Sequence, residues 1–86
     1  MQDILTKLEA TIRERKAAAP ESSYTAALFH KGSNHIAKKL AEEAVECALA
    51  SAKNDTANLA YEAADVLYHL LVLLHAHNLS LADACN

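Results

Sequence analysis

Five acidic residues stand in two spaced groups that could together hold a cation. The first group is Glu42, Glu43 and Glu46, and the second is Glu62 and Asp65. Within each group the spacing suits one side of a helix, where residues three or four apart are neighbours. If the two helices lie side by side, several carboxylates aim at one point. Such a cluster needs a cation, because like charges repel one another strongly when they are removed from water.

The helical wheel places these acids at the edge of an apolar face. At about 100° per residue, Glu43 falls within roughly 20° of Ile36, at the edge of the face that also carries Leu40 and Cys47. On the second helix Glu62 and Asp65 flank an apolar seam. A single glutamate on a helix is most often solvated, but a cluster at a core edge costs several kcal/mol unless a cation or a bound ligand offsets it. We therefore predict a cation site between two helices.

The chemistry of the ligands indicates which cation. Carboxylate oxygens alone suit Mg²⁺ or Mn²⁺, which keep waters and substrate phosphate oxygens in their coordination shells, and this favours phosphate chemistry. A di-iron bundle would require Glu-x-x-His pairs, and the sequence contains none. His69 follows Asp65 by one turn and could assist the site, although a packed core histidine is the commoner case.

The acids must be positioned by helices. The first part of the chain predicts two helices. Apolar residues recur at helical spacing over residues 3–19, which predicts an amphipathic helix that Pro20 ends or interrupts. Residue Ser22 or Ser23 can cap a short second helix that runs through Phe29. These helices carry no part of the acidic cluster, so their expected role is to cover the core.

The acids themselves fall on two longer helices. Gly32 suits the left-handed cap that closes the second helix, and a third helix is expected from Asn34 to about Lys53. Residues 54–56 supply a turn and an N-cap for a fourth helix that runs to about His77. Because short connections usually make neighbouring helices antiparallel, the acids of the third and fourth helices should face each other.

The end of the fourth helix predicts association between chains. Residues 66–74 are apolar around nearly the whole circumference, so this helix must be covered on several sides. Ser80 and Asp83 form a capping pair that opens a further short helix. A chain of 86 residues buries too little surface to provide that cover alone. We predict one all-α domain over residues 1–86, a small bundle of four to five helices completed by homodimerisation.

Composition excludes several classes of function. The net charge of −3 argues against nucleic-acid binding. The first 16 residues mix charges and lack the apolar core of a secretory signal, and we find no convincing membrane span, so we expect a cytoplasmic protein. The two cysteines, Cys47 and Cys85, are too few for a disulfide framework and form no CxxC pair.

The acidic pattern also carries a resemblance to known enzymes. The run E-E-x-x-E, followed after fifteen residues by E-x-x-D, resembles the signature of the all-α NTP pyrophosphatase superfamily, which includes MazG-like and dimeric dUTPase-type enzymes. Residues 23–28, 38–44 and 61–74 look like the phosphoribosyl-ATP pyrophosphatase family of histidine biosynthesis, and the resemblance covers almost the whole chain. Ala41 stands where that family would place a glycine before the acidic pair.

This resemblance implies hydrolysis of the α-β anhydride of phosphoribosyl-ATP to phosphoribosyl-AMP and pyrophosphate, with Mg²⁺ or Mn²⁺ as cofactor. The resemblance also implies that all five acids are catalytic. Glu43, Glu46, Glu62 and Asp65 are then the expected metal ligands, and Glu42 is either a ligand or the group that orients the attacking water.

Residues that would contact the substrate surround the acids. Lys38 or Lys39 would hold phosphates, and Lys31 would reach the phosphoribosyl end, unless these lysines simply form a solvated basic face. Tyr24 and Thr25 either line the substrate site or merely begin a helix. Lys53 and Asn54, at the turn between the acidic helices, would contact the substrate from a neighbouring subunit.

Two rival functions remain open at this point. A pyrophosphatase that acts on free nucleotides such as dCTP or dUTP would use the same metals with a different base pocket. A non-catalytic helical module would use the apolar helix only for dimerisation and would leave the acids solvated. A phosphoribosyl-AMP cyclohydrolase, fused to this activity in some relatives, is a candidate functional partner.

Overall fold

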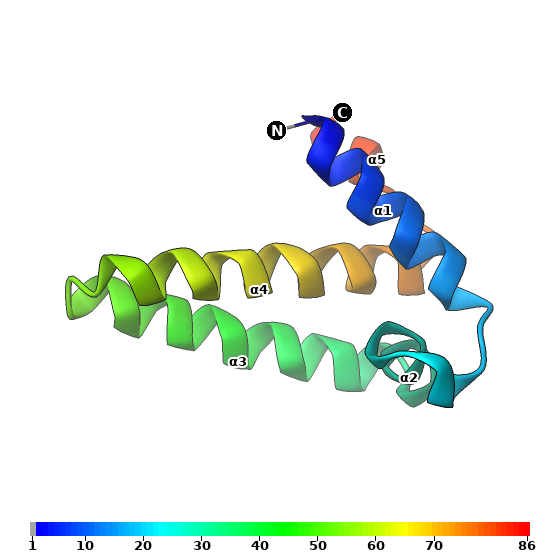
Figure 1. Ribbon diagram of the computed structural model, residues 1–86, viewed down its shortest axis with the longest axis horizontal. Coiled ribbons are helices and arrows are strands. Elements are labelled where there is room, and N and C mark those ends of the chain that lie inside the picture. Colours follow the sequence, from blue (N-terminus) through cyan, green and yellow to red (C-terminus); the bar gives the residue numbers. More distant parts are fainter. Residues whose placement is uncertain (1) are drawn as a thin grey trace.

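The structure, a computed structural model, describes residues 2–86. Among these residues the regular elements are all helical, as Figure 1 shows. They are α1 (Gln2–Lys16), the 3₁₀ turn η1 (Pro20–Ser22), α2 (Tyr24–Lys31), α3 (Ser33–Ala52), α4 (Thr56–Ala76) and α5 (Leu81–Cys85). The predicted all-α class and number of helices are therefore confirmed for the described part of the chain.

The first helix is shorter than predicted. It ends at Lys16, three residues before Ala19. Ala19 has φ −62° and ψ 141°, the extended backbone that a following proline imposes through contact with its ring. Pro20 then opens η1, an element that the sequence did not indicate. The expected helix end was wrong because alanines favour helix, whereas the residue before a proline is excluded from it.

The caps of the next helices follow the sequence closely. The Ser23 side chain accepts a hydrogen bond from the backbone N–H of Ala26 at 3.0 Å, so Ser23 rather than Ser22 is the N-cap of α2. Helix α2 runs past the expected Phe29 to Lys31. Gly32 has φ 96°, a region that side chains disfavour. This one glycine both ends α2 and begins α3.

A short turn joins α3 and α4, which run antiparallel and side by side (Figure 1). Asp55 caps α4 by accepting a hydrogen bond from the N–H of Asn58 at 3.2 Å. Asn54 adopts φ 55°, the left-handed conformation that asparagine tolerates better than most residues. The prediction of an antiparallel pair with a cap at residues 54–56 is confirmed.

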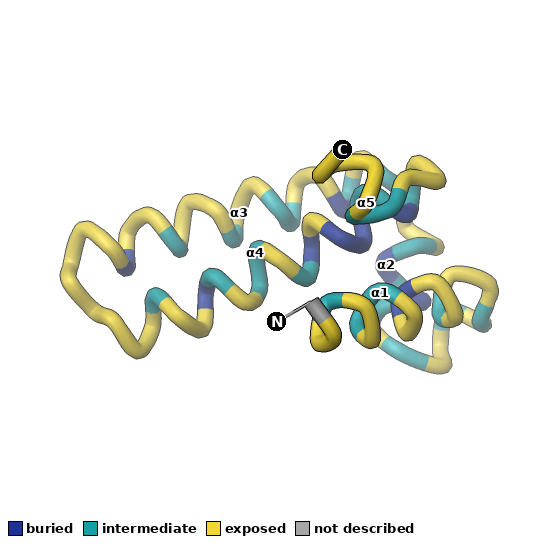
Figure 2. Tube along the Cα trace, turned by 90° about the horizontal axis from the view of Figure 1, so that it is seen from above, coloured by how far each residue is buried: buried dark blue, intermediate teal, exposed yellow. Residues whose placement is uncertain are grey.

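The main cluster of buried apolar residues lies at one end of this helix pair. Its members come from the first four α-helices and are Ile12, Leu28, Ile36, Leu71 and Val72. Toward the α3–α4 turn the chain buries little, and Figure 2 shows this arm mostly as exposed or intermediate. The molecule is accordingly elongated, at 39 × 26 × 21 Å. The fold thus has a packed end and a thin two-helix arm.

Helix α5 is fastened to the packed end by polar contacts. Ser80 and Asp83 form the predicted capping box: each side chain accepts a hydrogen bond from the backbone N–H of the other residue. The N–H of Leu81 donates to Glu9 Oε2 at 2.7 Å, and His75 Nε2 donates to the same oxygen at 2.8 Å. Glu9 therefore joins α1 to both α4 and α5.

The arm leaves large apolar side chains exposed. They are Val45, Leu49, Tyr61, Leu67 and Leu70. Helix α4 is also long and apolar enough to cross a membrane if length and composition alone are considered, a test that core helices of water-soluble proteins pass as well. The expected absence of a membrane span therefore stays a prediction.

Candidate metal centre

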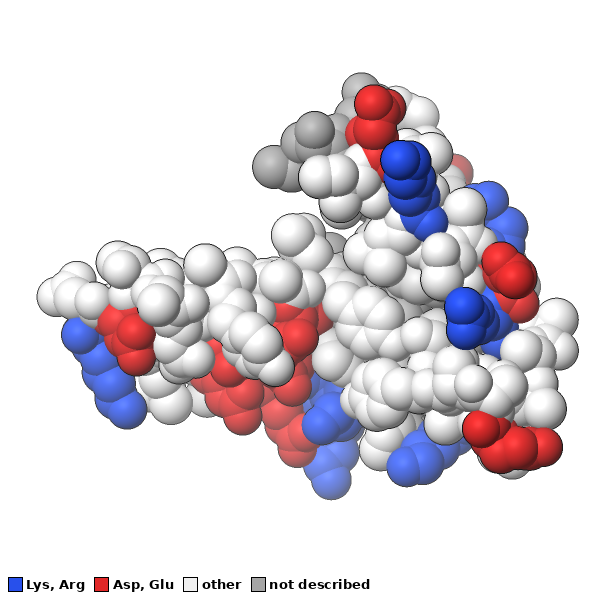
Figure 3. All heavy atoms as spheres, viewed as in Figure 1, with Lys and Arg blue, Asp and Glu red and all other residues white. Residues whose placement is uncertain are grey.

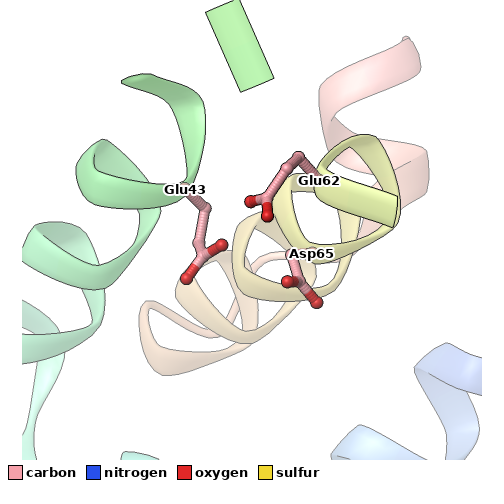
Figure 4. Close-up of side chains that lie close together, drawn as sticks. All are labelled: Glu43, Glu62 and Asp65. Atoms are coloured by element: carbon pink, nitrogen blue, oxygen red, sulfur yellow. The ribbon is translucent and has the colours of Figure 1, made fainter. Parts of the chain in front are cut away.

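Three carboxylates meet between the two helices of the arm. Glu43 comes from α3, and Glu62 and Asp65 come from α4 (Figure 4). One oxygen from each side chain lies within 4.8 Å of the other two. The antiparallel hairpin explains this meeting, because Glu43 and Asp65 are each eleven residues from Asn54. The cluster is therefore a direct consequence of spacing and of one short turn.

The same equal spacing on the two sides of the turn places a fourth acid beside the cluster. Glu46 and Glu62 are each eight residues from Asn54, on opposite sides of the turn. Glu46 is exposed, and it lines a hollow of about 350 Å³ together with Glu62 and Lys53. The structure thus brings Glu46 next to Glu62 but outside the set of three that converge.

Glu62 is the most deeply buried of these acids. Its exposed fraction is 8%, whereas Glu43 and Asp65 are half-buried. Its Oε2 atom has no hydrogen-bond partner among the described residues. A buried carboxylate oxygen without a donor is costly, and native proteins rarely retain one without a purpose. The unpartnered oxygen is therefore suited to bind a positively charged group.

The charge of Glu62 reflects this environment. Burial above all, and then the neighbouring carboxylates of Glu46 and Glu43, raise the pKa of Glu62 to about 7. In the absence of a cation the cluster therefore holds a proton near neutral pH. A bound cation would replace that proton and supply the charge that the carboxylates lack.

The donor set fits a hard divalent cation. It consists of carboxylate oxygens from two rigid helices and has no nitrogen or sulfur ligand, which is the chemistry that Mg²⁺ and Mn²⁺ prefer. Figure 3 shows acidic groups gathered over the middle of the α3–α4 arm, with basic groups on both sides of them. The field of this patch attracts cations to its centre and leaves room for phosphates at its margins.

The other acid of the motif, Glu42, lies apart from the cluster. It is exposed, and its Oε1 is 3.6 Å from Lys39 Nζ, one turn away on α3. An exposed pair of this kind contributes little to stability. Both groups remain free to face a ligand at the surface of the arm.

The predicted substrate residues fall in three places. Lys53 lines the hollow with Glu46 and Glu62, whereas Asn54 forms the turn itself. Lys31 and Lys38 are exposed. Asn58 and Asp55 also line the hollow, and sequence reasoning missed them as site residues because Asp55 already had a role as a cap.

Tyr24 and Thr25 contact α4 near the cluster. Thr25 Oγ1 and the Tyr68 hydroxyl form a hydrogen bond, and the Tyr24 hydroxyl lies 3.4 Å from His69 Nε2. His69 is 4% exposed, and its Nδ1 lies 2.8 Å from the backbone oxygen of Asp65. His69 is thus a hydrogen-bonded core histidine, and its position links α2 to the helix that carries two of the acids.

Comparison with known proteins now identifies the family. The family described as phosphoribosyl-ATP pyrophosphohydrolase matches residues 5–86. The chain belongs to this family. The phosphoribosyl-ATP pyrophosphatase of Rhodobacter capsulatus is 60% identical over 79 residues, which cover 92% of this chain and 77% of that protein. The family resemblance stated from residues 23–28, 38–44 and 61–74 is confirmed.

Two further relatives of this pyrophosphohydrolase family extend the comparison. The phosphoribosyl-ATP pyrophosphatase of Dinoroseobacter shibae is 54% identical over 93% of this chain and 78% of its own length. The histidine biosynthesis bifunctional protein HisIE of Photobacterium profundum is 51% identical over 92% of this chain, but the match spans only 38% of that protein. In that relative a pyrophosphohydrolase-like region is one part of a longer chain.

Proposed function

We infer that this chain hydrolyses phosphoribosyl-ATP to phosphoribosyl-AMP and pyrophosphate in the synthesis of histidine. The observation that carries this inference is the cluster of Glu43, Glu62 and Asp65, with its buried unpartnered oxygen, in a member of the phosphoribosyl-ATP pyrophosphohydrolase family. A solvated acidic face, as in a non-catalytic module, would not bury Glu62. The substrate class comes from the family, and the site gives it a place for the phosphates.

The acids are the proposed metal ligands. Glu43, Glu62 and Asp65 would hold Mg²⁺ or Mn²⁺, and Glu46 beside Glu62 would complete the set. When bound, the cation would offset the charge of the phosphate oxygens and polarise the attacking water. Because the raised pKa of Glu62, about 7, leaves it partly protonated at neutral pH without a cation, loading the site should release protons.

The residues around the cluster would bind the phosphates and orient the attacking water. Water attacks one phosphorus of the α-β anhydride, a new P–O bond forms, the bridging P–O bond breaks, and pyrophosphate leaves. Glu42, exposed on the same helix as Glu43, is the proposed group that orients this water. Lys39 beside Glu42, and Lys53 in the hollow beside Glu62, would neutralise the outer phosphate oxygens.

The other predicted residues would contact further parts of the substrate. Tyr24 and Thr25 lie on α2, next to the α4 segment that follows Asp65. Lys38 would add a further phosphate contact, and Lys31 would reach the phosphoribosyl end. We propose Asn54 as a contact made to the substrate of a neighbouring subunit, since it occupies the exposed tip of the arm.

We also propose that the enzyme is at least a homodimer. The exposed apolar side chains of the arm lie on both α3 and α4, and a second copy would cover them. The single domain would then be completed by its partner. A phosphoribosyl-AMP cyclohydrolase is the proposed functional partner, acting on the product, and the cytoplasm is the proposed compartment.

Product analysis tests the activity. Purified protein with Mg²⁺ should release pyrophosphate, and not orthophosphate, from phosphoribosyl-ATP, and it should turn over a panel of dNTPs far more slowly. Glu43→Gln and Asp65→Asn should abolish most of the release, while Glu14→Gln, an exposed acid on α1, should leave it unchanged. A strong preference for a dNTP would exclude the proposed substrate.

Light scattering tests the assembly. The unaltered chain should elute as a dimer or a larger species, and Leu67→Lys should shift it toward a monomer because Leu67 is an exposed apolar residue of the arm. Leu79→Lys, at an exposed apolar site beyond the end of α4, is the matched control and should not change the mass. A monomeric unaltered chain would contradict the proposal.

A further inference from the structure

Two adjacent residues of α4 hold two adjacent residues of α2. Tyr68 is hydrogen-bonded to Thr25, and His69 Nε2 lies 3.4 Å from the Tyr24 hydroxyl. These bonds link residues more than forty positions apart in the chain. The first turn of α2 is therefore tied to α4 immediately after Asp65, a member of the carboxylate cluster.

The bonds of His69 define which nitrogen carries the proton. A backbone carbonyl oxygen can only accept, so the Nδ1 atom, 2.8 Å from the Asp65 oxygen, must be the N–H that donates to it. In the neutral ring Nε2 is then an acceptor, and the Tyr24 hydroxyl donates to it. One imidazole thus connects the backbone of a cluster residue with the hydroxyl of a predicted substrate residue.

The packing of the aromatic rings sets how His69 is oriented relative to the two tyrosines. The His69 ring stands edge-on to both tyrosines, at interplanar angles of 82° to Tyr24 and 83° to Tyr68. Its centroid is 6.3 Å from that of Tyr24 and 5.0 Å from that of Tyr68. Aromatic pairs favour such edge-to-face arrangements. The edge-on contact with His69 therefore helps to fix the orientation of the Tyr24 ring.

Tyr24 has one further aromatic neighbour, since its ring is stacked on that of Tyr68, with the centroids 6.3 Å apart and an interplanar angle of 25°. Tyr24 is nevertheless largely open to solvent. Its exposed fraction is 57%, although it is a large aromatic residue at the first position of α2. An exposed ring with a tethered hydroxyl is suited to stack on a planar base, because much of its surface is accessible and the ring loses little freedom on binding. The buried His69, 4% exposed, provides the rigid half of the contact.

We propose that His69 is a positioning residue for the reaction: through the Tyr24 hydroxyl it fixes where the base of the nucleotide lies relative to the carboxylate cluster. This inference rests on the proposed function, and it assigns His69 to the base end of the substrate. His69 contacts neither the reacting phosphates nor the cation in this role. Its loss should therefore change substrate affinity and leave the rate of the chemical step nearly intact.

Two substitutions separate the nitrogens of His69. Asparagine retains an amide near the position of Nδ1 and removes the acceptor at Nε2, whereas glutamine places an acceptor near Nε2. His69→Asn should raise KM for phosphoribosyl-ATP about three- to tenfold, the scale of one lost neutral hydrogen bond, with kcat within about twofold. His69→Gln should restore most of the affinity. His77→Asn, at an exposed histidine just beyond the same helix, is the matched control.

Tyr24→Phe tests the same bond from its other end and avoids a buried substitution. It should raise KM by a similar factor, and the double variant Tyr24→Phe/His69→Asn should be no worse than either single variant, because both remove one interaction. Mg²⁺ titration without substrate should give the same affinity in every variant.

The outcomes distinguish this inference from the proposed function. Unchanged KM in Tyr24→Phe and His69→Asn, with an active unaltered enzyme, would overturn the positioning role alone. A fall in kcat with unchanged KM would overturn it too, since it would place His69 at the chemical step. An unaltered protein that does not hydrolyse phosphoribosyl-ATP would overturn the proposed function and this inference with it.

Discussion

Two shielded glutamates, Glu9 at the packed end and Glu62 in the arm, have opposite surroundings. Glu9 Oε2 accepts hydrogen bonds from the Leu81 N–H and from His75 Nε2, at 2.7 and 2.8 Å. Glu62 faces other carboxylates, and its Oε2 has no partner among the described residues. The fold thus supplies two hydrogen-bond donors to Glu9, whereas it places acidic groups around Glu62.

The pKa values of the two acids move in opposite directions for this reason. The Leu81 N–H above all, helped by His75, lowers the pKa of Glu9 against the opposing effect of burial. Burial and the acids Glu46 and Glu43 raise the pKa of Glu62 to about 7. Glu9 is therefore part of the packing, whereas the raised pKa of Glu62 supports its proposed role as a metal ligand.

The largest expected contrast between them is in activity. Glu62→Gln should lower the rate of pyrophosphate release at least about 100-fold, the scale on which enzymes lose rate when one charge-stabilising group is removed. Glu9→Gln should change that rate less than about threefold, because Glu9 takes part only in packing. Steady-state assays with saturating Mg²⁺ compare the two. A fully active Glu62→Gln variant would remove the metal-ligand role of Glu62.

The response to Mg²⁺ should also separate the two acids. A ligand present at about 100 times its Kd raises the free energy of unfolding by about 2.7 kcal/mol. We expect an increase on this scale for the unaltered protein and for Glu9→Gln at pH 8, and a much smaller increase for Glu62→Gln. Urea unfolding with and without Mg²⁺ measures the increase. An equal increase in all three proteins would place the cation elsewhere.

In the absence of a cation, Glu9→Gln should lower the free energy of unfolding, whereas Glu62→Gln should not. Glu9→Gln removes a charged acceptor shared by two donors and should cost about 1–2 kcal/mol of unfolding free energy. Glu62→Gln should stabilise the protein at pH 8, because it removes the repulsion among buried carboxylates. Thermal and urea unfolding in the presence of a chelator compare these variants with Glu14→Gln. Equal losses at both sites would show that Glu62 is also a packing residue.

Much of the arm could be predicted from the sequence, because its determinants are local. Asp55 caps α4, and equal separations from Asn54 bring Glu43 opposite Asp65 and Glu46 opposite Glu62. The acids therefore cluster whenever these two helices form a tight antiparallel pair. The end of α1 was mispredicted for an equally local reason, the constraint that a proline places on the residue before it.

Other features depend on contacts that spacing does not reveal. The spacing of the acids did not show that Glu62 would be the deepest, since its depth depends on how α3 covers α4. The pairing of Tyr68 and His69 with Thr25 and Tyr24 depends on where α2 docks, and no periodicity in the sequence encodes that position. Helical patterns predict which side of an element faces inward, whereas a particular long-range bond needs the whole fold.

The smallest expected effect, and the most direct test of the contrast, is the dependence of stability on pH in the absence of a cation. A raised pKa means that the folded state binds the proton more tightly than the unfolded state. The contribution of Glu62 is therefore fully present below the ordinary glutamate pKa of 4.5 and is lost as the pH rises through its raised pKa of about 7. For Glu9, whose pKa is lowered, the contribution is present above 4.5 and is lost as the pH falls below that value.

In a plot of unfolding free energy against pH, the two variants should consequently change opposite sides of the curve. Glu62→Gln should flatten the decline in unfolding free energy between pH 5 and pH 8, and Glu9→Gln should weaken the decline on the acid side. Urea unfolding with a chelator at several pH values measures both sides. If Glu62→Gln left the high-pH side unchanged, the proton near neutral pH would belong to another group, and the description of Glu62 as an acid that awaits a cation would be wrong.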